Sequence, residues 1–89
     1  MHPVEILRCI KQAIRHPHAW PGGYPLHVVM RDGEAITLQA ARENWQSICW
    51  ATLSCDGSGW AAIGVDVNWD DEAMMCSHTG EPIPCAYPA

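Results

Sequence analysis

The chain has 89 residues, a formal net charge of −5 and 48% apolar residues, which fits one small domain (residues 1–89) with a compact core. All five basic residues lie in the first half, whereas seven of the ten acidic residues follow position 42. This distribution argues against broad nucleic-acid binding, which needs a basic surface, and no apolar run approaches the ~18 residues of a membrane span.

Residues 1–16 lack the pattern of a signal peptide, because three basic residues interrupt their apolar positions. We therefore expect a cytoplasmic protein. Its five cysteines leave at least one thiol unpaired within a chain, and a reducing compartment disfavours a Cys76–Cys85 disulfide.

The first predicted element is a helix over residues 3–16. Pro3 suits a first helical turn, and Pro17 ends the helix because the residue before a proline is pushed out of the helical region. An apolar stripe recurs every four residues at Ile6, Ile10 and Ile14. A separate face carries Arg8, Lys11 and Arg15. We interpret this basic face as solvated helix surface.

A stiff loop is predicted for residues 16–25, because its prolines fix φ and its glycine pair permits a reversal. Residues 26–31 follow as a half-buried strand, in which apolar side chains alternate with outward positions such as His27. An Asp-Gly pair then predicts a hairpin turn, and residues 34–36 return as a short second strand.

A helix capped by Thr37 is predicted over residues 38–52. One face has packing residues at helical spacing, namely Leu38, Ala41, Trp45, Ile48, Cys49 and Thr52. Cys49 on this face indicates packing rather than chemistry. The Gly/Ser-rich loop that follows contains Cys55, which we expect to be exposed.

A further strand is predicted over residues 65–69, where Val65, Val67 and Trp69 alternate with polar residues. Three acids close it, Asp70, Asp71 and Glu72. They lack the alternating oxygen ligands of a structured cation-binding loop, so we interpret them as solvated charge.

The segment from Cys76 to Cys85 has the features of a zinc knuckle with one cysteine missing. A knuckle presents two thiolates, about three residues apart, to a tetrahedral ion. Cys76 and the turn glycine Gly80 are in place, but Thr79 occupies the partner position. One thiolate beside a threonine does not supply the soft donors that zinc needs.

Several longer stretches, taken in order, resemble a small uncharacterised protein family of bacterial mobile elements. They are Ala19 to Pro25 (AWPGGYP), Asp32 to Ala35 (DGEA), Ala41 to Asn44 (AREN), Gly59 to Ala61 (GWA), Gly64 to Trp69 (GVDVNW), and Ile83-Pro84 with Ala86-Tyr87. The match covers residues 17–87, and the helix over residues 1–16 precedes it.

The resemblance implies an α+β fold of the zinc-ribbon or treble-clef kind, with an N-terminal helix, a β-hairpin, a central helix and further short strands. The family pattern has two C-x-x-C pairs. Here Thr37 and Ala40 replace the first pair, and the second keeps Cys76 but has Thr79. We therefore expect a degenerate fold of this kind, without zinc or another cofactor. The alternative is a rebuilt metal site made of Cys76, His78 and Cys85.

We expect a protein that is not an enzyme. Cys55 with a histidine base is the one nucleophilic pair that can be drawn, and no phosphate-loop, dinucleotide or paired-carboxylate motif is present. The resemblance, the acidic second half and the five tryptophans favour an interaction protein of a phage or mobile element that binds a host protein. One concrete form is an anti-CRISPR-like inhibitor of a host defence complex.

Two alternatives stay open. One is a nucleic-acid-associated module in transcription or DNA processing, which would use the basic helix face with an aromatic neighbour such as Trp20. The other is a homodimer that buries tryptophans between subunits.

We expect the partner-binding residues on exposed surface rather than in a pocket. They are Trp20 and Tyr24 in the stiff loop, and Asp66, Asp70, Asp71 and Glu72 on the acidic edge. The competing interpretation is that the two loop aromatics pin the loop to the core, where we also expect most of the tryptophans.

Overall fold

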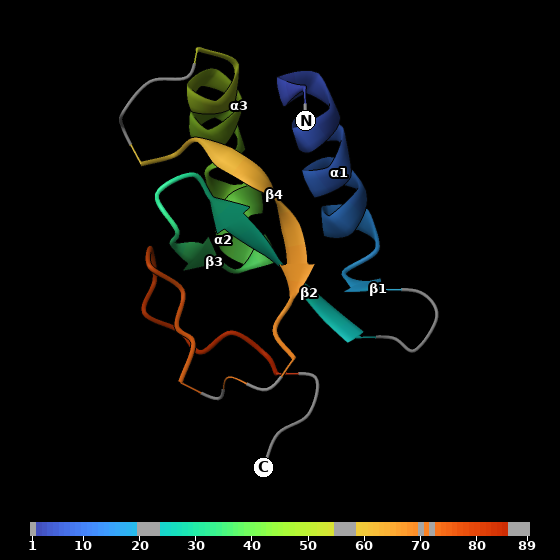
Figure 1. Ribbon diagram of the computed structural model, residues 1–89, viewed down its shortest axis with the longest axis vertical. Coiled ribbons are helices and arrows are strands. Elements are labelled where there is room, and N and C mark those ends of the chain that lie inside the picture. The colour runs from blue at the N-terminus through green and yellow to red at the C-terminus, as the bar shows by residue number, and fades with distance from the viewer. Residues whose placement is uncertain (1, 20–23, 55–58, 70, 72, 86–89) are drawn as a thin grey trace.

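A computed structural model describes residues 2–19, 24–54, 59–69, 71 and 73–85 (Figure 1). Its helices are α1 (Pro3–Arg15), α2 (Leu38–Glu43) and α3 (Trp45–Ser54). Its strands are β1 (His18–Ala19), β2 (Tyr24–Met30), β3 (Ala35–Ile36) and β4 (Ala62–Val67). Helices and an antiparallel sheet in one small fold confirm the predicted α+β class.

β2 is the central strand of the sheet. Val28 pairs with Val65 of β4 and with Ile36 of β3, and β1 pairs with the first two residues of β2. The predicted Asp-Gly hairpin turn joins β2 to β3. Gly33 has a φ of 91° there, which favours glycine, and the Glu34 N–H donates to the Asp32 carboxylate at 3.0 Å.

α1 confirms the predicted N-terminal helix. It begins after His2, whose Nδ1 accepts the Val4 N–H at 3.1 Å, and it ends before Pro17. Its buried residues are Ile6, Ile10 and Ala13. The helix contacts β4 and both α2 and α3 (Figure 1), so its apolar stripe is covered while its basic residues stay at the surface.

The segment after β3 forms two helices rather than the single helix predicted over residues 38–52. Thr37 caps α2 as predicted, and its Oγ1 accepts the Ala40 N–H at 3.1 Å. α2 ends at Asn44, where φ is −117° and ψ is 29°. The Asn44 side-chain amide donates to the Ala40 carbonyl at 2.9 Å. The Asn44 backbone N–H donates to the same carbonyl at 3.1 Å, so Asn44 closes α2 as its C-cap before Trp45 begins α3.

His27 does not follow the predicted alternation of its strand. The alternation places His27 outside, but the side chain is only 4% exposed. His27 lines a cavity together with residues 17–18 and with Glu81, Pro82 and Pro84. A local pattern could not show this, because these segments come from distant parts of the chain.

The strand predicted over residues 65–69 ends earlier, at Val67. Asn68 is then buried, and its side-chain amide donates to the carbonyls of Asp71 at 2.7 Å and Ile83 at 3.3 Å. Trp69 is 48% exposed. The prediction was wrong about which of the two residues packs inside, because the carbonyls of Asp71 and Ile83 satisfy the buried amide.

The core lies between the helices and the sheet, and it includes residues of the C-terminal turn. Its members are Ile6, Ile10, Val28, Met30, Ile36, Ala40, Ala41, Ile48, Ala62, Cys76 and Ile83. Trp45 and Trp60 pack against it, whereas Trp50 is 72% exposed. Fewer of the described tryptophans therefore pack against the core than we predicted. No helix of the described residues is long and apolar enough to cross a membrane.

Candidate functional site

A groove runs between α1 and the α2–α3 pair. It consists of three adjoining hollows of about 430, 220 and 470 Å³, and each shares lining residues with the next. We call it the cationic groove. Its apolar lining residues are Val4, Leu7, Ile14, Leu38, Trp45 and Cys49. Its basic lining residues are Arg8, Lys11, Arg15 and Arg42.

α1 supplies one wall of the cationic groove. Arg8, Lys11 and Arg15 are spaced by three and four residues, which places them along one side of a helix. Leu7 and Ile14 each precede one of these arginines and are half-buried against the core. The wall therefore changes from apolar at its base to basic at its rim.

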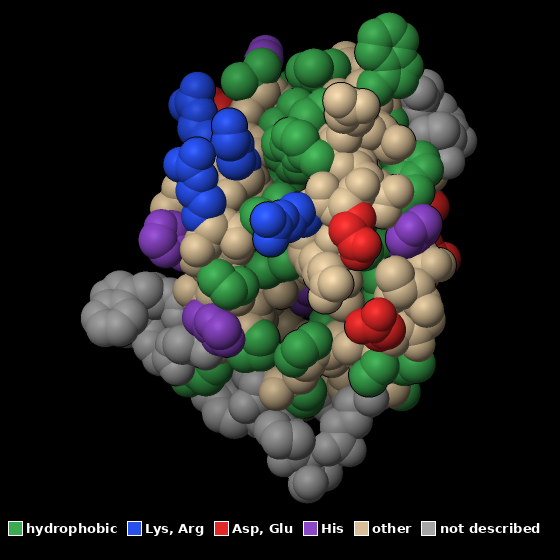
Figure 2. Space-filling view, turned by 180° about the vertical axis from the view of Figure 1, so that it is seen from behind, with side chains coloured by type: hydrophobic (Ala, Val, Ile, Leu, Met, Phe, Trp, Pro, Cys, Tyr) green, Lys and Arg blue, Asp and Glu red, His purple; other side chains and the backbone are tan. Residues whose placement is uncertain are grey.

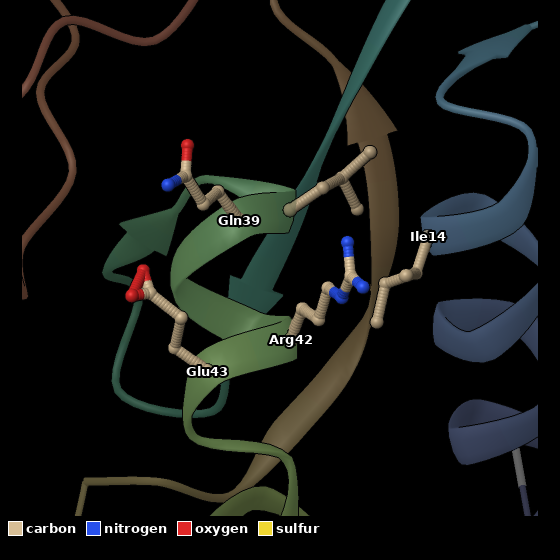
Figure 3. A pocket seen from close by; sticks show the side chains of 5 residues that line it. Ile14, Gln39, Arg42 and Glu43 are labelled. Carbon is tan, nitrogen blue, oxygen red and sulfur yellow. The ribbon is translucent and has the colours of Figure 1, made fainter.

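The opposite wall depends on the helix break at Asn44. Arg42 lies in the last turn of α2, and Trp45 is the first residue of α3. Figure 3 shows the Arg42 side chain pointing from α2 toward Ile14 on α1, whereas the Glu43 carboxylate points away from it. Glu43 nevertheless lines the same 470 Å³ hollow, so this end of the groove carries one acidic residue next to Arg42.

The bases of the cationic groove have no carboxylate partner in the part of the chain that the structure describes. Figure 2 shows the Lys and Arg side chains gathered on this face, with hydrophobic side chains between them. Burial raises the pKa of the Cys49 thiol, although nearby Lys11 acts in the opposite direction. The thiol therefore stays neutral, and Cys49 belongs to the apolar part of the groove.

The structure describes three of the six predicted partner-binding residues. Tyr24 is half-buried and packs edge-on against Trp69, with ring centroids 4.9 Å apart and planes at 61°. Trp69 is itself 48% exposed and outside the core, so this contact holds Tyr24 against a neighbouring segment and not against the core. Trp20 lies outside the described residues.

Asp66 and Asp71 are exposed, as predicted for the acidic edge. Each carboxylate also accepts a local backbone N–H, from Val67 at 2.7 Å and from Ala73 at 3.0 Å. These bonds fix the direction of both side chains. The other two members of this set, Asp70 and Glu72, lie outside the described residues, as does Cys55.

The positions that the resemblance assigns to two halves of a metal site do lie together. The backbone N–H and the hydroxyl of Thr37 both donate to the Cys76 Sγ, at 3.4 and 3.9 Å. Ala40 is buried in the same core cluster as Cys76. Two segments that are about forty residues apart in the chain therefore meet at one sulfur.

Hydrogen bonds control the ionisation of this sulfur. Burial acts to raise the pKa of the Cys76 thiol, but the hydroxyl of Thr79 and the N–H groups of Thr37, Thr79 and His78 donate to it. Together these donors outweigh burial and lower the pKa below its ordinary value. The sulfur is surrounded by hydrogen-bond donors, and this donor cradle favours the negatively charged thiolate.

The side chains of His78 and Cys85 do not join Cys76. The His78 ring packs edge-on against Trp60, with centroids 5.0 Å apart, and the Cys85 thiol donates to the Trp69 carbonyl at 3.5 Å. Cys76 and Cys85 are both free thiols. The described residues contain no group of three His, Cys, Asp or Glu side chains that could hold a metal ion. The alternative of a rebuilt site is therefore not formed by these side chains.

Sequence reasoning identified the basic face of α1 but interpreted it as solvated surface. It missed Arg42 and Trp45, because a single predicted helix gave no reason to place them opposite α1. The signal in the sequence was the asparagine directly before Trp45, Asn44. Comparison of the chain with protein-family models, curated proteins and solved structures found no match.

Proposed function

We propose that the protein is a non-catalytic binding module whose cationic groove takes an acidic, amphipathic helix of a partner protein. One observation carries this proposal: four of the five bases of the chain surround an apolar strip and lack carboxylate partners among the described residues. Such a surface is complementary to a segment with acids on its flank and apolar side chains on its contact face.

A helix fits the groove better than an extended segment does. The bases of α1 repeat every three to four residues, and a helix lying alongside α1 presents its own side chains at the same spacing. The wall from Val4 to Arg15 is about 17 Å long at 1.5 Å per residue. This length corresponds to about three turns of a partner helix.

The resemblance to mobile-element proteins supports a host protein as the source of that helix. An inhibitor of a host defence complex, including an anti-CRISPR-like one, is a concrete form of this proposal. Partner binding through the acidic edge would use a different surface. Asp66 and Asp71 are exposed on that edge and can contact a basic partner.

A nucleic-acid-associated role is the second candidate, and the same bases favour it. A single strand could follow the four bases and stack on Trp45. We rank it second because Trp45 is half-buried against the core and because the chain as a whole carries a net charge of −5. Both features weaken stacking and phosphate binding.

The test is a fluorescence-anisotropy titration with a labelled helical peptide that has leucines at helical spacing and glutamates on one flank. The key variant changes Arg8, Lys11, Arg15 and Arg42 to glutamine. We expect at least several-fold weaker binding, since exposed charge pairs contribute about 0.2–1 kcal/mol each. Binding of the wild type should also weaken as salt is raised.

Arg31→Gln is the matched control, because it removes the one base outside the groove and should leave the affinity unchanged. Trp45→Ala, checked for folding by circular dichroism, should weaken binding through the loss of apolar contact. Equal affinity of the four-base variant and the wild type would refute the groove. Tighter binding of a labelled oligonucleotide, with the same dependence on these bases, would promote the second candidate.

A further inference from the structure

The middle hollow of the cationic groove differs from the two hollows beside it. Its volume is about 220 Å³, and its lining residues are Lys11, Ile14, Arg15, Arg42 and Trp45. The surface that it exposes is almost entirely apolar, whereas both neighbouring hollows also expose much polar surface. We call this hollow the three-base socket.

The long side chains of Lys11, Arg15 and Arg42 account for this apolar surface. Each of the three residues is exposed, and each carries its charge at the end of an aliphatic stem. The stems can line the socket while the charged groups stay in water around its opening. Ile14 and Trp45 are half-buried against the core and supply the rest of the lining. Figure 3 shows Arg42 and Ile14 facing each other from α2 and α1.

The size and charge of the three-base socket indicate what fits it. Cavities for whole small ligands usually exceed about 300 Å³, so a hollow of about 220 Å³ suits a single side chain. An aromatic side chain would also pack against the Trp45 ring, and aromatic pairs contribute more than their buried area alone. Of the acids that the structure describes, none lines the socket, and Glu43 lines the adjoining 470 Å³ hollow. The acidic groups must therefore come from the occupant.

We propose that the three-base socket takes one aromatic side chain of the partner helix, with acidic residues one and three positions before and after it. This inference rests on the proposed function and specifies the sequence that the cationic groove recognises. A helix turns by about 100° per residue, so the positions three before and one after the aromatic residue share one flank. The positions one before and three after it share the other flank.

This pattern matches the placement of the bases. The two acids on each flank of the partner helix are spaced by four residues, as Lys11 and Arg15 are on α1. One flank therefore meets Lys11 and Arg15, and the other meets Arg42 on the opposite wall. Because the pattern is symmetric about the aromatic residue, it fits whichever direction the partner helix takes along the groove.

The test is an anisotropy titration with three labelled helical peptides. The first has phenylalanine at the centre and glutamates at the four flanking positions, and the second has alanine in place of phenylalanine. The third keeps the composition of the first but has its glutamates on the face away from the phenylalanine. We expect the alanine peptide to bind about tenfold more weakly and the third peptide several-fold more weakly at unchanged net charge. Alanine at a leucine outside the socket, the matched control, should cost less.

A second readout locates the aromatic side chain. The ¹⁵N–¹H signal of the Trp45 indole, assigned with a Trp45→Phe variant, should shift with the phenylalanine peptide and shift less with the alanine peptide. A ring that packs against Trp45 changes this signal, whereas charge contacts at the opening of the socket do not place a ring there.

Charge reversal tests the flanks. Lys11→Glu/Arg15→Glu, checked for folding by circular dichroism, should prefer a peptide that has lysines on one flank of the phenylalanine and glutamates on the other. The wild type should prefer glutamates on both flanks. Such a crossed preference depends on where the charges lie and not on net charge alone.

The outcomes separate this inference from the proposed function. Equal affinity for all three peptides, together with weaker binding by the four-base variant, would overturn the socket and leave the groove as a surface for an acidic helix. An absence of the crossed preference would also overturn the socket. An absence of binding by every peptide would overturn the proposed function and the socket with it.

Discussion

At the scale of one residue, the buried sulfur of Cys76 links two parts of the chain by hydrogen bonds. Its Sγ accepts hydrogen bonds from Thr37, Thr79 and His78, so one atom satisfies donors at a helix start and at a C-terminal turn. Without the sulfur the N–H and the hydroxyl of the half-buried Thr37 would lose their shared acceptor. Its contribution to stability is therefore larger than its volume suggests.

Cys76→Ala should lower the free energy of unfolding by about 2–4 kcal/mol, because it removes the acceptor of the two Thr37 donors and opens a small cavity in the core. Urea denaturation followed by tryptophan fluorescence measures the change. Cys85→Ala is the control, since that thiol is half-buried and donates to one carbonyl. Equal losses for the two variants would contradict the role of the donor cradle.

His27 couples stability to pH. Burial lowers its pKa in the folded protein below the value of 6.5 of the unfolded chain, and Asp66 opposes the shift. As pH falls through 6.5 the unfolded chain binds the proton first, so this part of the stability is present above pH 6.5 and is lost below it.

We therefore expect the free energy of unfolding to decrease as pH is lowered from about 7.5 to the folded-state pKa, by about 1.4 kcal/mol per unit of pKa difference at most. The measurement is urea denaturation at a series of pH values. His27→Gln should flatten this part of the profile. A profile that keeps its slope in the variant would assign the effect to another group.

At the scale of the elements, the N-terminus of α2 and the Cys76–Gly80 turn form a matched pair. The Thr37 cap and the Cys76 sulfur hold them together, and the Ser77 N–H donates to the Ala35 carbonyl at 2.9 Å. This is the arrangement in which two C-x-x-C pairs would face each other.

The variant Thr37→Cys/Ala40→Cys/Thr79→Cys should bind one zinc ion per chain, because with Cys76 it supplies four thiolates from the two facing turns. Cobalt substitution and native mass spectrometry measure the site. The wild-type chain, with one of the four thiolates, should carry no zinc. A triple variant that folds but binds no metal would contradict the assignment of these positions.

At the scale of the whole molecule, the basic and acidic residues that are separated along the sequence also lie on different parts of the surface. Four of the five bases gather around the cationic groove, whereas Asp66 and Asp71 lie beyond it on β4 and the segment that follows. A chain with a net charge of −5 therefore still offers a local positive surface. The net charge is a sum over the whole chain, so it does not indicate this local positive surface.

The extent of prediction from the sequence differs between local and long-range features. The α1 helix, the Asp-Gly hairpin and the Thr37 cap follow from short-range preferences, and all three are found where they were predicted. The helix break at Asn44 was missed because it lies in the backbone of one residue, where φ is −117° and ψ is 29°. Periodicity over the flanking residues does not register a change at one residue.

The sequence by itself determined the α+β class, the basic face of α1 and the Thr37 cap of α2. Only the tertiary structure decided that Arg42 and Trp45 face α1, that Asn68 is buried, and that His27 lines a cavity. These outcomes depend on contacts between segments that are far apart in the chain. Spacing along a sequence specifies which side of an element a residue occupies, but the packed fold decides what covers that side.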